Sequence, residues 1–210
     1  MKKHISLEKS LFVFGTGRSG TTMLLRILSC HPDLAWFSKL NDRFPRLHQL
    51  SGLSRIRDID RFSGLVSGVG RLMPMPVEAI GVPRAMTNGQ FQSHSILQLK
   101  DIDAKAVDSY RHKICQIMKW HGKPRFLHKH TGFARLQYLS AIDESGHFVQ
   151  VIRDGRAVAY SLLRVPWWSG TLDSWWWGKM PAGYEEEYLR SNKDPLTLAA
   201  IVWKHLLDLS

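Results

Sequence analysis

Cysteine is scarce in this chain of 210 residues, which contains two, Cys30 and Cys115. A disulfide framework needs several pairs, and a zinc site needs clustered ligands, so two isolated thiols argue against both. We therefore expect no metal site and a reducing, cytoplasmic location for the protein.

Long apolar runs are also missing. No stretch reaches the roughly 20 apolar residues that a membrane-spanning helix needs, so the sequence predicts no membrane span. The amino terminus carries Lys2, Lys3, His4, Glu8 and Lys9 in place of the apolar segment of a signal peptide.

Acidic residues are few relative to basic ones, 18 against 29, which gives a formal net charge of +11. Such a surface attracts anions. Nucleic acid, an anionic nucleotide and an acidic acceptor molecule are all anions, so composition does not decide between these partners.

What the sequence does contain is a repeated strand, loop and helix pattern. Residues 11–14 form an apolar run that breaks at a glycine-rich loop, and residues 22–28 have helical spacing. A second apolar run at 147–152 is followed by a helical pattern at 157–164. Strands that alternate with helices predict a parallel sheet covered on both faces. We expect an α/β fold with three layers, similar to the P-loop proteins, in which a central parallel sheet is flanked by helices.

The remaining segments complete this picture. A further short strand is expected at 125–128, and helices are expected at 104–120, 133–142 and 195–209. Residues 41–100 have weak periodicity and predict a loop-rich insertion with short helices. With 44% hydrophobic residues, the chain suits one domain over 1–210. No capping glycine follows the last helix, so we expect the domain to lack its C-terminal part.

The first loop has the glycine spacing of a phosphate-binding loop, Gly15-x-x-x-x-Gly20-Thr21-Thr22. Backbone N–H groups of such a loop and of the helix after it hold phosphate oxygens. Thr21 stands where nucleoside triphosphatases have a lysine, while Arg18 lies inside the loop. The loop therefore suits a smaller anion such as a phosphosulfate, although glycines with this spacing also occur in plain strand-to-helix turns.

The run from Gly17 to Thr22, Gly-Arg-Ser-Gly-Thr-Thr, resembles the 5′-phosphosulfate loop of sulfotransferases that use 3′-phosphoadenylyl sulfate (PAPS). A second match supports this resemblance. In that family a strand ends in an arginine that binds the 3′-phosphate together with a serine eight positions later, and Arg153 and Ser161 have this spacing. His31-Pro32-Asp33 further resembles the bacterial and tyrosylprotein members.

The resemblance implies transfer of a sulfuryl group from PAPS to a hydroxyl or amine of an unidentified acceptor (sugar, lipid, phenol or peptide), with release of 3′,5′-ADP and without nucleic acid as a partner. The nucleotide-binding residues it implies are Gly17, Arg18, Ser19, Gly20, Thr21, Thr22, Arg153 and Ser161. Arg18 is expected to stabilise the leaving oxygen, and Lys129 to contact the sulfuryl oxygens. Metal is not expected, because the transferred group carries a single negative charge.

The general base is less well defined. Tyrosylprotein members have a glutamate shortly after His-Pro-Asp, which this chain lacks. Asp42 and His130 are the first candidates, with His48 and His128 as competitors.

Two other functions remain open. A P-loop nucleotide kinase would need a loop lysine and magnesium, and a basic nucleic-acid-binding module would need basic and aromatic residues on one surface. Neither accounts for the Arg153 and Ser161 pair. Five tryptophans between 167 and 177 either line the acceptor site or cap the core, and we favour capping.

Overall fold

A parallel β-sheet forms the centre of the computed structural model, which describes residues 7–58, 74–87, 89, 91, 103–132 and 135–210. Within these residues the sheet has four strands in the order β2-β3-β1-β4. Their bounds are β1 Leu11–Gly15, β2 Leu34–Trp36, β3 Arg125–Thr131 and β4 His147–Val151. Strand β1 pairs in parallel with both β3 and β4, which confirms the predicted parallel pairing of residues 11–14 with 147–152.

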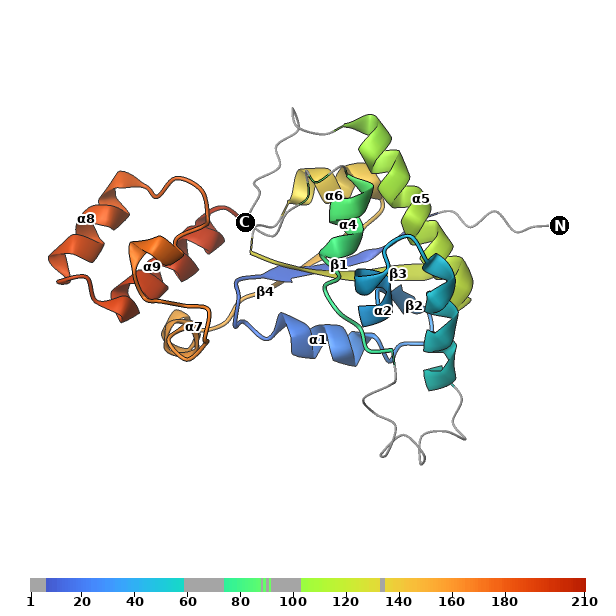
Figure 1. The fold of residues 1–210 in the computed structure, drawn as a ribbon, viewed down its shortest axis with the longest axis horizontal. Helices are drawn as coiled ribbons and strands as arrows, with labels where there is room; N and C mark the ends of the chain where they lie inside the picture. The colour runs from blue at the N-terminus through green and yellow to red at the C-terminus, as the bar shows by residue number, and fades with distance from the viewer. Residues whose placement is uncertain (1–6, 59–73, 88, 90, 92–102, 133–134) are drawn as a thin grey trace.

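Side chains alternate across the sheet and divide the interior into two cores. Phe12 and Phe126 point to one face, where they pack with α5 and α6, and Val13 and Leu127 point to the other face with Leu25 of α1. Figure 1 shows α1 below the sheet and α4, α5 and α6 above it. The expected three-layer α/β fold is therefore confirmed.

The helices of the sheet domain agree with the sequence in most places. Their bounds are α1 Thr21–Leu28, α2 Lys39–Arg43, α4 Gly81–Met86, α5 Ala104–His121 and α6 Leu136–Ile142, with a 3₁₀ helix η1 at His48–Asp58. The Asp103 side chain caps α5 by accepting from Lys105 N, and Gly122 ends it with a φ of 71°. The short strand β2 was not predicted.

A second, helical lobe follows β4. It contains α7 Gly155–Leu162, the 3₁₀ helix η4 Leu172–Ser174, α8 Ala182–Arg190 and α9 Pro195–Asp208. Helices α7 and α9 pack together around buried Leu198 and Val202. In Figure 1 this lobe lies beside the end of the sheet to which β1 and β4 point.

The tryptophan-rich segment divides between the lobe's interior and its surface. Trp168 and Trp177 are buried in the lobe core, as the capping interpretation expects of them. Trp167 and Trp176 remain 50% and 45% exposed. No helix in the described part of the chain has the length and apolar character to cross a membrane.

Candidate functional site

The loop between β1 and α1 is built around two residues with positive φ. Gly20 caps α1 in the left-handed conformation with a φ of 98°, and Arg18 has a φ of 68°. The hydroxyls of Thr16 and Ser19 share a hydrogen bond, and Ser19 N donates to Thr16 O at 3.3 Å. The first turn of α1 contains no acidic residue. The helix N-terminus therefore offers unpaired N–H groups to an anion.

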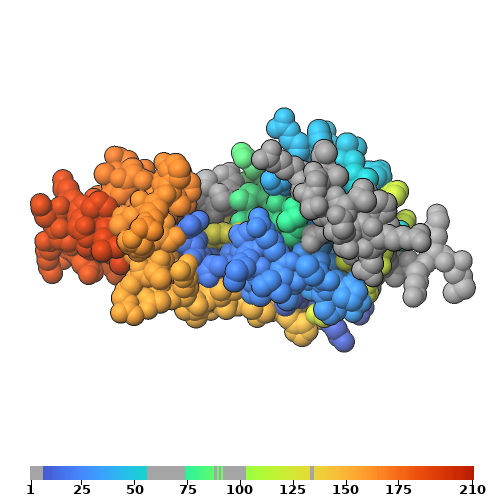
Figure 2. All heavy atoms as spheres, turned by 90° about the horizontal axis from the view of Figure 1, so that it is seen from below, coloured from blue at the N-terminus to red at the C-terminus, as the bar shows by residue number. Residues whose placement is uncertain are grey.

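Arg18, Arg153 and Ser161 lie next to one another at the carboxyl ends of β1 and β4. Arg18 Nε donates to Ser161 Oγ at 2.9 Å, and an Arg153 terminal N–H donates to Arg18 O at 3.1 Å. In Figure 2 the blue N-terminal unit and the orange residues around 160 are side by side on the surface. The two arginines therefore lie on the same side of the molecule, and their expected role in binding one nucleotide stays a prediction.

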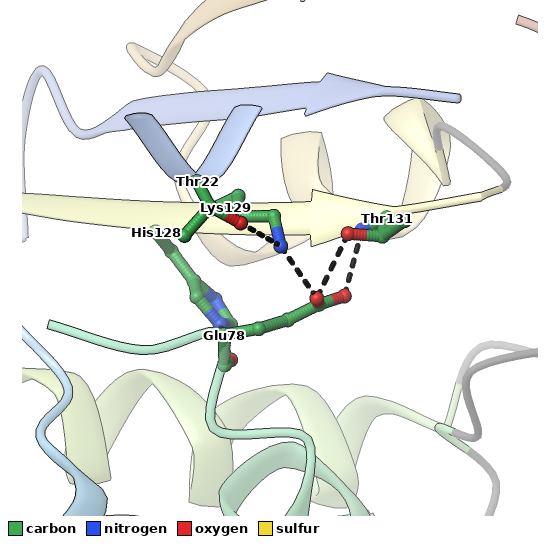
Figure 3. A network of polar contacts seen from close by, with 5 residues as sticks. All are labelled: Thr22, Glu78, His128, Lys129 and Thr131. Carbon is green, nitrogen blue, oxygen red and sulfur yellow. Dashed lines mark hydrogen bonds and ion pairs between the residues drawn. The ribbon is translucent and has the colours of Figure 1, made fainter. Parts of the chain in front are cut away.

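Lys129 lies between the loop helix and an acidic residue that the sequence analysis did not identify, Glu78 (Figure 3). Lys129 Nζ donates to Glu78 Oε2 at 2.8 Å and to Thr22 Oγ1 at 3.4 Å. The side chains of Lys129 and Glu78 are 8% and 20% exposed. Lys129 thus connects the first turn of α1 to a partly buried carboxylate.

Glu78 occupies the edge of β3 that β2 leaves uncovered. Strand β2 pairs with β3 only as far as Trp36 and Leu127. Beyond this point Thr131 N donates to Glu78 Oε1 at 2.7 Å, and Thr131 Oγ1 donates to Glu78 Oε2 at 2.8 Å. The carboxylate therefore replaces the backbone carbonyls that a longer neighbouring strand would supply.

These contacts keep Glu78 ionised. Burial by itself would raise its pKa, but the Lys129 ammonium, together with hydrogen bonds from Lys129 and Thr131, lowers the pKa below the ordinary value. The acid is a carboxylate at neutral pH and can accept a proton.

His128 holds the backbone of Glu78. Its Nε2 lies 2.7 Å from Glu78 O, a carbonyl that can only accept, so Nε2 carries the proton. His128 Nδ1, at 2.8 Å, then accepts from the Tyr110 hydroxyl. Burial is the main cause that lowers the pKa of His128 to about 4, so the ring stays neutral in this chain of bonds.

The two base candidates from the sequence occupy other positions. The Asp42 carboxylate accepts from Gly81 N at 2.8 Å at the start of α4. His130 is buried against Phe12 and Phe91, and its Nε2 has no hydrogen-bond partner within the described part of the chain. Burial, followed by neighbouring positive charges, lowers the pKa of His130 well below its ordinary value. Their proposed role as bases stays a prediction.

A cavity of about 690 Å³ opens between the sheet domain and the helical lobe. Thr16, Glu78 and Thr131 line it on the side of the sheet, and Trp167, Trp176 and Trp203 line it on the side of the lobe. Neither Asp42 nor His130 is among the described residues in its wall. A neighbouring groove of about 910 Å³ runs between α7 and α9 and includes Arg153.

Comparison with known proteins gives the family of this chain. The model of a sulfotransferase family matches residues 10–194. The chain belongs to the sulfotransferase family. Among curated proteins, no sequence matches it significantly.

A solved structure provides a distant likeness. The sulfotransferase STF9 from Mycobacterium avium shares 13% identity, with a TM-score of 0.48, over 75% of this chain and 46% of that chain. The sulfotransferase chain described here therefore spans about half the length of that relative.

Sequence reasoning missed Glu78 because its neighbours show no helical or strand period. One signal was present: Glu78 is the only charged residue between Arg71 and Arg84, in a stretch that is otherwise apolar. A lone acid in such a stretch needs a buried partner, and Lys129 is that partner. Among the described residues, no group of three or more His, Cys, Asp or Glu side chains is arranged to hold a metal.

Proposed function

We propose that this sulfotransferase transfers the sulfuryl group of PAPS to a hydroxyl acceptor and releases 3′,5′-ADP. The observation that carries the proposal is the meeting of Arg18, Arg153 and Ser161 at one sheet edge, with the Glu78 and Lys129 pair beside the same loop. The scarcity of cysteine supports a cytoplasmic setting.

PAPS carries a 5′-phosphosulfate and a 3′-phosphate, so binding it needs two anion sites. The chain has a candidate for each. The N-terminus of α1, with Ser19, Thr21 and Thr22, suits the 5′-phosphate. Arg153 and Ser161 suit the 3′-phosphate, because a guanidinium and a hydroxyl on adjacent structural elements can bind the same monoester.

Glu78 is the general base in this proposal. It is ionised, and it lines the cavity between the two lobes. As the acceptor oxygen bonds to sulfur, Glu78 takes the hydroxyl proton, and the bond between sulfur and the 5′-phosphate oxygen breaks. Arg18 lies in the loop where it can balance the charge that grows on this leaving oxygen.

Lys129 adjusts the strength of this base. In the structure it pairs with Glu78 and also reaches Thr22 on α1. A bound phosphosulfate draws the ammonium toward the loop, which removes a cation from Glu78 and raises the pKa of its carboxylate. The base thus becomes stronger when the donor is present. No metal is required by this scheme, because Arg18 and Lys129 meet the single charge of the sulfuryl group.

Calorimetric titration tests the donor. We expect 3′,5′-ADP to bind in the absence of metal and ATP with magnesium to bind at least tenfold more weakly. Preference for ATP with magnesium would favour a nucleotide kinase, and tight binding of single-stranded DNA would favour a nucleic-acid-binding module. Either result would contradict the proposed function.

A further inference from the structure

Trp167 and Trp176 form an exposed pair of indoles in the wall of the cavity that contains Glu78. Their ring centroids are 5.5 Å apart, and the planes meet at 32°. Large aromatic side chains left half exposed in one patch, while Trp168 and Trp177 beside them are buried, indicate a binding surface. The pair contributes little to the lobe's core and is free to contact a ligand.

Among the described residues, the hydroxyl and carboxylate side chains of the cavity wall gather at one end. They are Thr16, Glu78 and Thr131, from the loop after β1, the end of β3 and the segment beside it, and the tryptophans add only indole N–H donors. Thr131 already donates to Glu78, and Thr16 is bonded to Ser19. Glu78 is the carboxylate of this group, and its Oε1, which accepts one hydrogen bond from Thr131 N, can accept a second one from an acceptor hydroxyl.

The rest of the wall is apolar. Ile80, Leu162, Val202 and Leu206 line it together with the indoles. A sugar exposes several hydroxyls, and those that face this apolar part of the wall lose their hydrogen bonds to water without gaining a partner, which weakens binding. A molecule with one hydroxyl on an apolar body has only that group to satisfy, and Glu78 can accept its hydrogen bond. The cavity volume of about 690 Å³ is within the usual range for a ligand of several rings.

We propose that the acceptor is a phenol, or another alcohol with a single hydroxyl on a flat apolar ring system, held by Trp167 and Trp176 with its hydroxyl at Glu78. This inference rests on the sulfuryl transfer proposed above and adds the class of acceptor. Flat rings match the indole faces, and aromatic pairs stabilise a complex beyond the apolar area that they bury.

Binding of two probes to the full chain, loaded with 3′,5′-ADP, tests the acceptor class. The probes are 2-naphthol and methyl β-D-glucoside. We expect naphthol to bind at least tenfold more tightly and to yield naphthyl sulfate when PAPS replaces 3′,5′-ADP. Trp167→Ala combined with Trp176→Ala should weaken naphthol binding about tenfold or more, and phenylalanine at both positions should restore part of it.

Trp120→Ala is the matched control, because Trp120 is 40% exposed on α5 and is not part of the cavity wall. It should leave naphthol binding unchanged. Equal or tighter binding of the glucoside would overturn the acceptor class. Wild-type naphthol affinity in the double alanine variant, folded and still able to bind 3′,5′-ADP, would overturn it as well. Failure of the wild-type chain to bind 3′,5′-ADP would instead overturn the proposed function, because that titration does not involve the tryptophans.

Discussion

Arg18 Nε donates to Ser161 Oγ at 2.9 Å, although the two residues are 143 positions apart in the chain. One belongs to the loop after β1 and the other to the helix after β4, and these two strands are neighbours in the sheet. The contact brings the two proposed phosphate sites together before any nucleotide is bound. The following predictions separate the roles of the residues around it.

Replacement of Arg153 by alanine should weaken 3′,5′-ADP binding by about 1.5–3 kcal/mol, the usual range for a hydrogen bond to a charged group. Adenosine 5′-phosphosulfate should bind with nearly unchanged affinity, since it lacks the 3′-phosphate. Calorimetry with both ligands measures the difference. The control is Arg190→Ala, which removes an arginine from α8 whose side chain is 79% exposed. Equal losses for the two ligands would show that Arg153 has a structural role.

Arg18→Ala should act mainly on the rate, lowering kcat roughly a hundredfold or more, as when one transition-state donor is removed. Its φ of 68° strains arginine and alanine alike, so the loop should keep its conformation in this variant. Lysine should restore part of the rate because it keeps the charge. Single-turnover sulfuryl transfer is the measurement. An unchanged chemical step with weaker PAPS binding would identify Arg18 as a binding residue only.

Glu78→Gln should lower the single-turnover rate by about a hundredfold or more, because general-base catalysis contributes roughly 10²–10⁴. Glutamine can still accept the hydrogen bond from Thr131 N. Thermal unfolding and 3′,5′-ADP binding report whether the variant, which leaves Lys129 without its counter-ion, remains folded.

Asp42→Asn provides the comparison for that variant, because Asp42 is the acid that sequence analysis ranked first. Its carboxylate caps α4 through Gly81 N. We expect some loss of stability and a chemical step close to wild type. A larger rate loss in Asp42→Asn than in Glu78→Gln would reverse the assignment of the base.

Stability should fall between about pH 6.5 and pH 4 as the solution becomes more acidic. The pKa of His128 is lowered to about 4 in the folded chain by burial, against the ordinary 6.5, and the pKa of His130 is also lowered. In this window the unfolded chain binds protons that the folded chain does not bind. Each histidine then contributes a slope of up to about 1.4 kcal/mol per pH unit, and the full contribution is present above pH 6.5.

His130→Phe should make this slope shallower without loss of sulfuryl transfer. His130 is buried beside Phe12 and Phe91, and its Nε2 has no partner among the described residues, while Arg135 and Lys129 add positive charge nearby. Phenylalanine removes a buried polar atom without a partner. Denaturant unfolding at several pH values measures the slope. Loss of transfer in a folded His130→Phe variant would support His130 as the base instead of Glu78.

The sequence was sufficient for the parts of the fold that local patterns encode. Strands β1 and β4 are apolar runs bounded by glycine or charged residues, and α1 and α7 follow them directly, so both units were placed within two residues. Strand β2 was missed because its three residues are too few to show a period and its pairing with β3 is remote in sequence.

The sequence also indicated part of the candidate site. Arg18, Arg153 and Ser161 could be named in advance because they belong to motifs with fixed spacing. Lys129 was expected just beyond a strand ending at residue 128, whereas β3 continues to Thr131, where it pairs with Gly15 of β1. The other edge of β3 donates to Glu78, which lies 53 positions earlier in the chain. The lone acid indicates that a buried partner exists, but no local pattern says which residue it is. The division of the tryptophans into buried and exposed members likewise depends on how α7 and α9 pack.

The position of β1 in the sheet has a consequence for folding. Among the described strands β1 comes first in the sequence, yet both of its partners, residues 125–131 and 147–151, come much later. Leu11 to Phe14 therefore emerge from the ribosome as an apolar segment with two unpaired edges, and these edges stay unpaired until residues 125–151 have been made. Parallel pairing of such remote segments is slow, and exposed edges favour association with other chains. The strand that holds the phosphate loop is thus also the segment whose newly made form most needs protection from aggregation.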